Sequence, residues 1–166
     1  MSTIKMDVES TTPSTPSASK GKLYFKSDNI PYALNEDGTE FDLTAAAGAR
    51  WITIAISDET TDLTTGAAKG TLILPYGYTV ASVFASVTTA PTGTTLIFDI
   101  NEGGVSILST KISIDVSENH SGTAATPPVI SDSSIAQYAV VTFDIDQIGS
   151  GTAGAGAKIS MYITPV

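Results

Sequence analysis

The segment TLIFDINEGGVSIL, residues 95–108, constrains the fold of this chain more than any other part of it. Its first half places Leu96, Phe98 and Ile100 on one face and Ile97, Asp99 and Asn101 on the other. This period of two is typical of a strand with one buried and one wet face. Glu102, Gly103 and Gly104 then supply a turn, because glycine reaches positive φ without steric cost. The segment therefore predicts a β-hairpin in an antiparallel sheet.

Composition limits the classes of partner. The chain has 166 residues, of which 42% are hydrophobic, enough for one domain with a real core plus a tail. Its formal charge of -9 would repel a nucleic-acid backbone. No apolar stretch approaches the ~20 residues that span a bilayer, and the first 20 residues lack the apolar core of a secretory signal. We expect synthesis in a cytoplasm, with no nucleic-acid and no membrane partner.

Three regions of the chain differ in composition. Residues 1–20 contain a stretch rich in Ser, Thr and Pro, which buries too little apolar surface to order itself and predicts a flexible, extended arm. Residues 21–48 contain short apolar runs and predict a small β-strand module that ends in a hinge. Residues 49–166 contain about eight apolar runs separated by Thr, Gly and Pro turns, and predict the main domain.

The main domain is predicted to be all-β. Alternating or apolar runs predict strands at Trp51–Ser57, Thr71–Pro75, Tyr78–Val87, Lys111–Val116, Tyr138–Ile145 and Lys158–Ile163, besides the hairpin. Antiparallel strands at this spacing favour a two-sheet sandwich of jelly-roll type. Polar loops are expected at 58–70 and 117–128, with a weak helical candidate at Leu63–Ala68. The glycine-rich segment 149–157 precedes a strand rather than a helix, which argues against a phosphate loop.

Two look-alike strands carry the candidates for a metal site. The sequence repeats FDIN and FDID, which places Asp99, Asn101, Asp144 and Asp146 on outward faces. If the two strands are neighbours, their oxygens could hold a hard cation such as calcium. The simpler interpretation, which we favour, is that acids alternate with apolar residues because that face is wet. We therefore expect no metal and no cofactor.

The sequence offers no recognisable catalytic set. Cysteine is absent, and the single histidine, His120, lies in a loop next to serine and glutamate. Neither a G-x-S-x-G nor an H-E-x-x-H motif occurs, so His120 is expected to be an exposed loop residue and the protein not an enzyme. Paired carboxylates facing each other across a cleft stay open as an alternative.

The small module carries more aromatic surface than it can bury. Its predicted strands Leu23–Phe25 and Pro31–Leu34 and the turn Asn35–Gly38 precede Phe41 and the hinge Ala45–Gly48. We interpret a set of apolar residues as an anchoring interface, since aromatic side chains are enriched in interface cores. This set comprises Leu23, Tyr24, Phe25, Tyr32 and Phe41. The alternative is that these side chains pack back onto the main domain.

Segments 51–66, 71–115 and 130–150 together resemble a module common in structural proteins of tailed bacteriophages, and APTGTTLIFDINEGG is the most specific part. GKLYFKSDN and PYALNEDGTEFDL are similar to short strands near the start of phage fibre proteins. The resemblance implies a virion surface component, made in the host cytoplasm, that is a symmetric oligomer without enzymatic activity.

The expected function follows from this resemblance and from the anchoring module. We expect a capsid decoration, cement or head-fibre protein, and a trimer by analogy, because three-fold sites are common for such parts. Its arm and module would grip the major capsid protein or another virion protein. The alternative is a tail-fibre or receptor-binding module whose loops at 58–70 and 117–128 contact host glycans.

Overall fold

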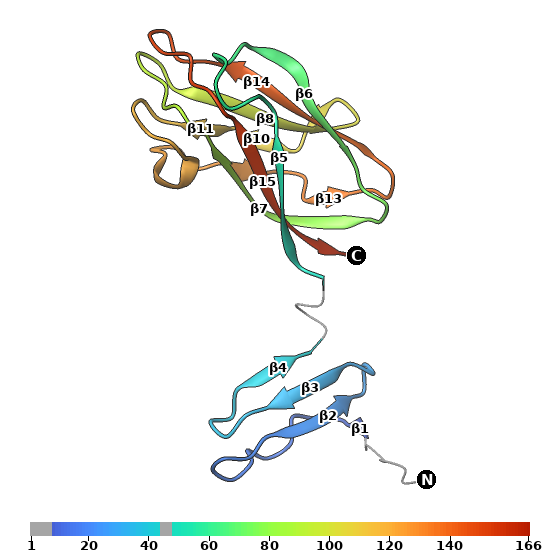
Figure 1. Ribbon diagram of the computed structural model, residues 1–166. Helices are drawn as coiled ribbons and strands as arrows, with labels where there is room; N and C mark the ends of the chain where they lie inside the picture. The colour runs from blue at the N-terminus through green and yellow to red at the C-terminus, as the bar shows by residue number, and fades with distance from the viewer. Residues whose placement is uncertain (1–7, 44–47) are drawn as a thin grey trace. The chain divides into compact units, whose positions relative to one another are not determined.

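The computed structural model describes residues 8–43 and 48–166, which fall into two compact units, Met1–Ala49 and Arg50–Val166 (Figure 1). The boundary between them lies within one residue of the predicted start of the main domain. The predicted hinge residues Ala45–Ala47 and the first seven residues of the predicted arm lie outside the described residues.

The N-terminal unit contains a four-stranded sheet in the order β1-β2-β3-β4. Its strands are β1 (Val8–Glu9), β2 (Lys22–Lys26), β3 (Pro31–Leu34) and β4 (Glu40–Asp42). β1 runs parallel to β2, whereas the other pairs are antiparallel. The tight connection between β3 and β4 forms because Asn35 accepts hydrogen bonds across the turn, with Gly38 at a positive φ of 86°. The two short strands predicted in this module are confirmed.

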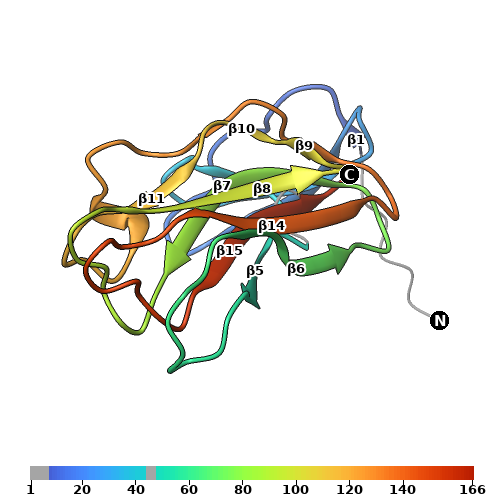
Figure 2. The same cartoon turned by 90° about the horizontal axis from the view of Figure 1, so that it is seen from above.

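The C-terminal unit is all-β, with antiparallel sheets packed in two layers (Figures 1 and 2). One sheet has the order β11-β8-β14-β6, with β9 also paired to β8; the other has the order β13-β7-β15-β5. A two-stranded sheet of β10 and β12 accompanies them. The strands are β5 (Arg50–Ala55), β6 (Gly66–Ile73), β7 (Tyr78–Ser86), β8 (Leu96–Glu102), β9 (Val105–Ser106), β10 (Leu108–Thr110), β11 (Ile112–Ile114), β12 (Val129–Ile130), β13 (Ser134–Ile135), β14 (Val140–Gln147) and β15 (Lys158–Pro165). A single 3-10 turn, η1 (Ser121–Thr123), lies between β11 and β12.

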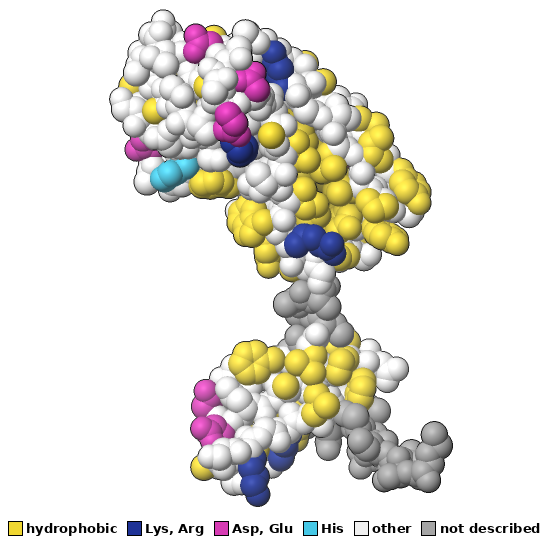
Figure 3. Space-filling model, in the orientation of Figure 1, with side chains coloured by type: hydrophobic (Ala, Val, Ile, Leu, Met, Phe, Trp, Pro, Cys, Tyr) yellow, Lys and Arg dark blue, Asp and Glu magenta, His cyan; other side chains and the backbone are white. Residues whose placement is uncertain are grey.

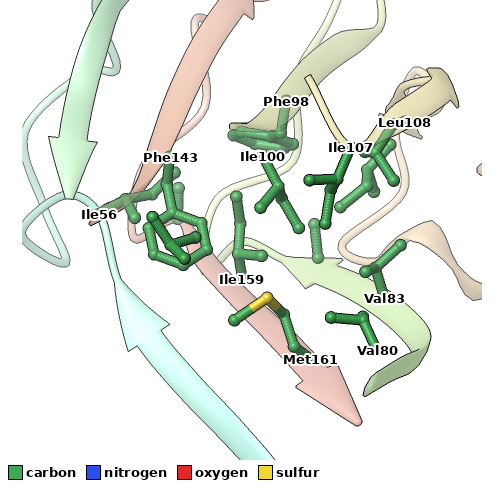
Figure 4. Close-up of a cluster of buried hydrophobic side chains, with 14 of the residues drawn as sticks. Ile56, Val80, Val83, Phe98, Ile100, Ile107, Leu108, Phe143, Ile159 and Met161 are labelled. Atoms are coloured by element: carbon green, nitrogen blue, oxygen red, sulfur yellow. The ribbon is translucent and has the colours of Figure 1, made fainter. Parts of the chain in front are cut away.

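The core lies between the two sheets and is filled by alternate residues of each strand. Leu96, Phe98 and Ile100 of β8 are fully buried, as the hairpin pattern predicts. Side chains from β14, the neighbouring strand of the same sheet, and from β15 of the facing sheet pack beside them (Figure 4). Figure 4 labels members of both layers: Ile56, Val80, Val83, Phe98, Ile100, Ile107, Leu108, Phe143, Ile159 and Met161. Burial of a large apolar side chain contributes about 1.5–3 kcal/mol, so this interior holds the sandwich together.

Three local predictions differ from the structure. β6 begins at Gly66, inside the segment predicted as a polar loop, because Gly66–Gly70 pairs with β14 although its small residues show no strand pattern. Leu63–Ala68 is not helical; Leu63 is instead buried in the core. The predicted strand Lys111–Val116 is shorter in the structure: β11 ends at Ile114, and Val116 is 41% exposed.

The glycine-rich segment 149–157 is part of the packed structure rather than a free loop. Backbone hydrogen bonds join it to the neighbouring loops, from Thr92 to Thr152 and from Gly156 to Asp58. A β-carbon on Gly156, where φ is +70°, would lie 2.0 Å from Oγ1 of Thr88. The glycine there is therefore required by both the backbone conformation and the close approach.

We expect Gly156→Ala to lower the free energy of unfolding by about 2–4 kcal/mol, because it adds a steric clash to the cost of a left-handed alanine. Gly103→Ala is the matched control, since Gly103 also has positive φ (+57°) but nothing within 4 Å of an added β-carbon. That variant should lose only about 1 kcal/mol. Urea denaturation measures both, and equal losses would contradict the close-packing argument.

Candidate functional site

One face of the N-terminal sheet is apolar and uncovered by its own unit. Cross-strand pairing places Leu23, Ala33 and Phe41 in one row. A second row joins Phe25 to Pro31, whose carbonyl accepts the backbone N–H of Leu43. Leu23 is 57%, Phe41 50% and Leu43 48% exposed. We call these six residues the apolar face; Figure 3 shows apolar side chains gathered on one side of this unit.

The opposite face of the same sheet is closed by the chain itself. Tyr24 and Leu34 are 5% and 2% exposed, and Pro16 of the preceding segment is buried with them. Thr12 donates a hydrogen bond to Glu40 (2.7 Å), and the Lys22 ammonium donates one to the Ser14 carbonyl (2.6 Å). The described part of the predicted arm, residues 8–20, therefore contacts the module instead of standing apart from it. This one-sided closure leaves the apolar face as the open side of the sheet.

Two residues of the predicted anchoring interface lie on the closed side. Tyr24 and Tyr32 are cross-strand neighbours whose rings stack with centroids 5.9 Å apart, and the Lys26 ammonium lies 4.3 Å from the centre of the Tyr32 ring. They face away from the apolar face because strand residues alternate between the two sides of a sheet. The other three predicted residues, Leu23, Phe25 and Phe41, lie on the apolar face, the side of the sheet that is open to a partner.

Sequence reasoning missed three members of the apolar face: Pro31, Ala33 and Leu43. The signal was present in the alternation, since counting every second residue outward from Leu23 and from Phe41 selects Phe25 and Leu43. Pro31 and Ala33 join the apolar face through cross-strand pairing. That pairing depends on the strand register, which cannot be read from the sequence alone.

Glu40 is the electrostatic centre of the closed side. Its carboxylate accepts hydrogen bonds from Lys26 (2.5 Å), from the Tyr24 hydroxyl and from Thr12. These hydrogen bonds lower the pKa of Glu40 from 4.5 to about 2, and the bond from Lys26 has the largest effect. The same contact raises the pKa of Lys26, and burial followed by the bond to Glu40 raises the pKa of Tyr24. The network ties β2 to β4 and to the segment that covers them.

The candidate metal residues are engaged with protein donors. The Lys111 ammonium lies 3.0 Å from Asp99 and 2.6 Å from Asp146. Asp144 accepts hydrogen bonds from Asn101 (3.0 Å) and from the backbone N–H of Ala68 (2.7 Å). Among residues 8–43 and 48–166, no group of three or more His, Asp or Glu side chains could hold a metal ion.

The hairpin pattern placed Asp99 and Asn101 on a wet face, and this prediction is wrong. Both side chains are buried, at 4% and 8% exposed. Ser106 of the second hairpin strand is paired with Asn101, and its hydroxyl donates to Asp99 (2.6 Å). Lys111 reaches Asp99 because Ile112 is paired with Phe98, which sets the preceding residue opposite Asp99. The pairing of strands therefore replaces solvent with an ammonium and a hydroxyl.

His120 lies in a loop and is exposed, as expected. Its Nδ1 accepts the backbone N–H of Gly122 at the start of η1, and its ring stacks on Phe84 at 6.0 Å. These contacts assign it a local structural role in the turn between β11 and β12.

Comparison with known proteins found no match to a family model, to a curated protein or to a solved structure. In the part of the chain that the structure describes, no helix is long and apolar enough to cross a membrane.

The Glu40 network predicts a pH dependence. Because folding holds the pKa of Glu40 near 2, below its unfolded value of 4.5, the stabilisation is complete above about pH 4.5 and is lost as the pH falls toward 2. NMR titration of the Glu40 carboxyl carbon should give a midpoint near 2. Lys26→Met should raise it, whereas Lys20→Met, at an exposed lysine, should not. A midpoint near 4.5 in the unaltered protein would show that the network does not form.

The ion pair between Lys111 and Asp99 of β8 predicts a loss of stability when the cation is removed. Lys111→Met removes the cation beside the buried Asp99 carboxylate and should lower the free energy of unfolding by about 1–3 kcal/mol. Adding Asp99→Asn to that variant should recover part of the loss, because no charge then stays buried without a partner. Guanidinium denaturation of the two variants measures this, and a double variant less stable than the single one would refute the pairing.

Proposed function

We propose that this chain is a non-enzymatic structural protein of a tailed-phage virion, displayed on the outer surface. The N-terminal unit attaches it to the particle, as in a decoration, cement or head-fibre protein. The partner is the major capsid protein or another virion protein. The attached copies form a symmetric oligomer, with a trimer as the arrangement that the sequence resemblance implies.

The apolar face carries this proposal. A four-stranded sheet of strands only 2–5 residues long has little core of its own. It nevertheless leaves Leu23, Phe41 and Leu43 about half exposed while a polar segment of the chain covers its other side. Contiguous exposed apolar surface on a small unit is typical of a protein interaction site. A separate unit with such a surface is suited to anchoring a larger domain.

The strand order of the C-terminal unit supports the jelly-roll part of the proposal. β5, β7, β13 and β15 form one sheet, whereas β6, β8, β11 and β14 form the other. Successive strands thus cross repeatedly between the two layers, and the last strands, β14 and β15, lie inside the sheets beside early ones. Double-sheet jelly rolls, common in viral capsid proteins, have this arrangement.

Particle binding tests the proposal. Leu23→Ser combined with Phe41→Ser should weaken binding to virions produced without this protein by about tenfold or more, because each change removes an apolar interface contact. Val116→Ser is the control, since it alters an apolar side chain of similar exposure in the other unit. Co-sedimentation with the particles measures binding. Undiminished binding of the double variant would contradict the anchoring role, and binding to host glycans instead would favour a receptor-binding module.

A further inference from the structure

Most of the large apolar side chains that the C-terminal unit exposes lie at one of its two ends. At this end the chain leaves β6 for β7, enters β14 and terminates after β15 (Figures 1 and 2). We call the following six residues the terminal patch: Ile73, Tyr76, Val105, Tyr138, Val140 and Val166. Of the other large apolar side chains exposed in the described part of this unit, Trp51 also lies at this end, whereas Val116 and Val129 do not.

Backbone contacts place the segments of the terminal patch side by side. Ile73 and Val140 are cross-strand partners. The N–H of Tyr138 donates to the carbonyl of Leu74, and that of Val166 donates to the carbonyl of Gly77, next to Tyr76. The hairpin that carries Val105 joins the same end, because Gly103 donates to the carbonyl of Val140. Figure 3 shows apolar side chains gathered over this end of the unit.

The exposure of Tyr138 is maintained at a conformational cost. It has a φ of +61°, in the left-handed region that a bulky residue rarely adopts, and its side chain is 65% exposed. Glycine or asparagine would occupy this position with less strain. A strained backbone that projects an aromatic ring into solvent indicates a side chain held out for contact.

The size of the terminal patch suits a protein interface. Its members are between 45% and 90% exposed. A fully buried aromatic side chain contributes about 150–250 Å², so the six side chains together present on the order of 600 Å². A standard interface buries about 800 Å² per partner, and Trp51, 53% exposed at the same end, extends the patch toward that value.

The area of the terminal patch suits a second copy of the same chain as the occupant, and the scarcity of acidic groups at this end lowers the repulsion that opposes such a contact. Each copy carries a formal charge of -9, so two copies repel except where acidic groups are sparse. The side chains of the six members of the patch are uncharged. Glu102, an acid at this end, is turned to the backbone N–H of Ala136 (2.8 Å). Several other acids, including Asp58, Glu59 and Glu118, belong to the loops of the opposite end, which are joined through Thr88, Val87 and Gly156.

We infer that the terminal patch is the contact through which copies of this chain associate. This inference does not depend on attachment to a particle, because it concerns the purified chain. It assigns the two apolar surfaces different roles: the apolar face of the N-terminal unit meets another virion protein, and the terminal patch meets a second copy.

Sedimentation velocity of the full chain over a wide concentration range tests the inference. The unaltered protein should form an oligomer that dissociates on dilution. Tyr138→Gly combined with Tyr76→Ser should weaken the association about tenfold or more. Tyr138→Gly relieves the positive-φ strain, so the variant should fold and melt normally by circular dichroism. Val116→Ser and Val129→Ser, which alter exposed valines away from the patch, should leave the association unchanged.

Trp51 gives an independent measurement, because it is the single tryptophan of the chain and lies at the patch end. Its emission should shift to the red on dilution of the unaltered protein and stay constant in the Tyr138→Gly, Tyr76→Ser variant. A monomer at every concentration would overturn the inference. An oligomer that the Tyr138→Gly, Tyr76→Ser variant leaves intact would also overturn it. If Leu23→Ser combined with Phe41→Ser then dissociated that oligomer, the apolar face of the N-terminal unit would be the contact between copies.

Discussion

The packing of two apolar sheet faces against each other is the constraint on which the rest of the C-terminal unit depends. Phe98 and Phe143, on neighbouring strands of one sheet, and Met161 of the other sheet are fully buried between the layers. Because each strand gives alternate side chains to this interior, the remaining ones must face outward. The outward positions then differ along the sandwich: polar loops are hydrogen-bonded together at one end, and apolar side chains are exposed at the other.

The sequence predicted the buried side of most strands because the alternation of apolar residues is local. Ile52, Ile54 and Ile56 face the core, as do the inward residues of the hairpin. Predictions failed where the answer depended on distant residues. Asp99 is buried because Lys111 and Ser106 reach it from neighbouring strands, and Tyr24 is on the closed side because the chain before β2 folds over it. The first part of β6 was not predicted because its glycine and alanine residues show no alternation of apolar and polar side chains.

The same reasoning explains how much of the candidate site could be predicted. Composition alone identified a module too small to bury its aromatic side chains, and three of the five proposed interface residues are on the exposed apolar face. The terminal patch could not be found in this way, since its members come from four separate segments that only the fold brings together. Hydrophobic residues scattered singly in a sequence are ordinary, whereas their clustering at one end of a sandwich is informative.

These observations describe a protein with an apolar surface in the described part of each of its two units. Cryo-electron microscopy of the virion with this protein bound tests the central claim most directly. The account predicts that Leu23, Phe41 and Leu43 are buried against another virion protein while the polar loops of the sandwich face solvent. Density in which that apolar face is exposed, and the sandwich loops make the attachment, would contradict it.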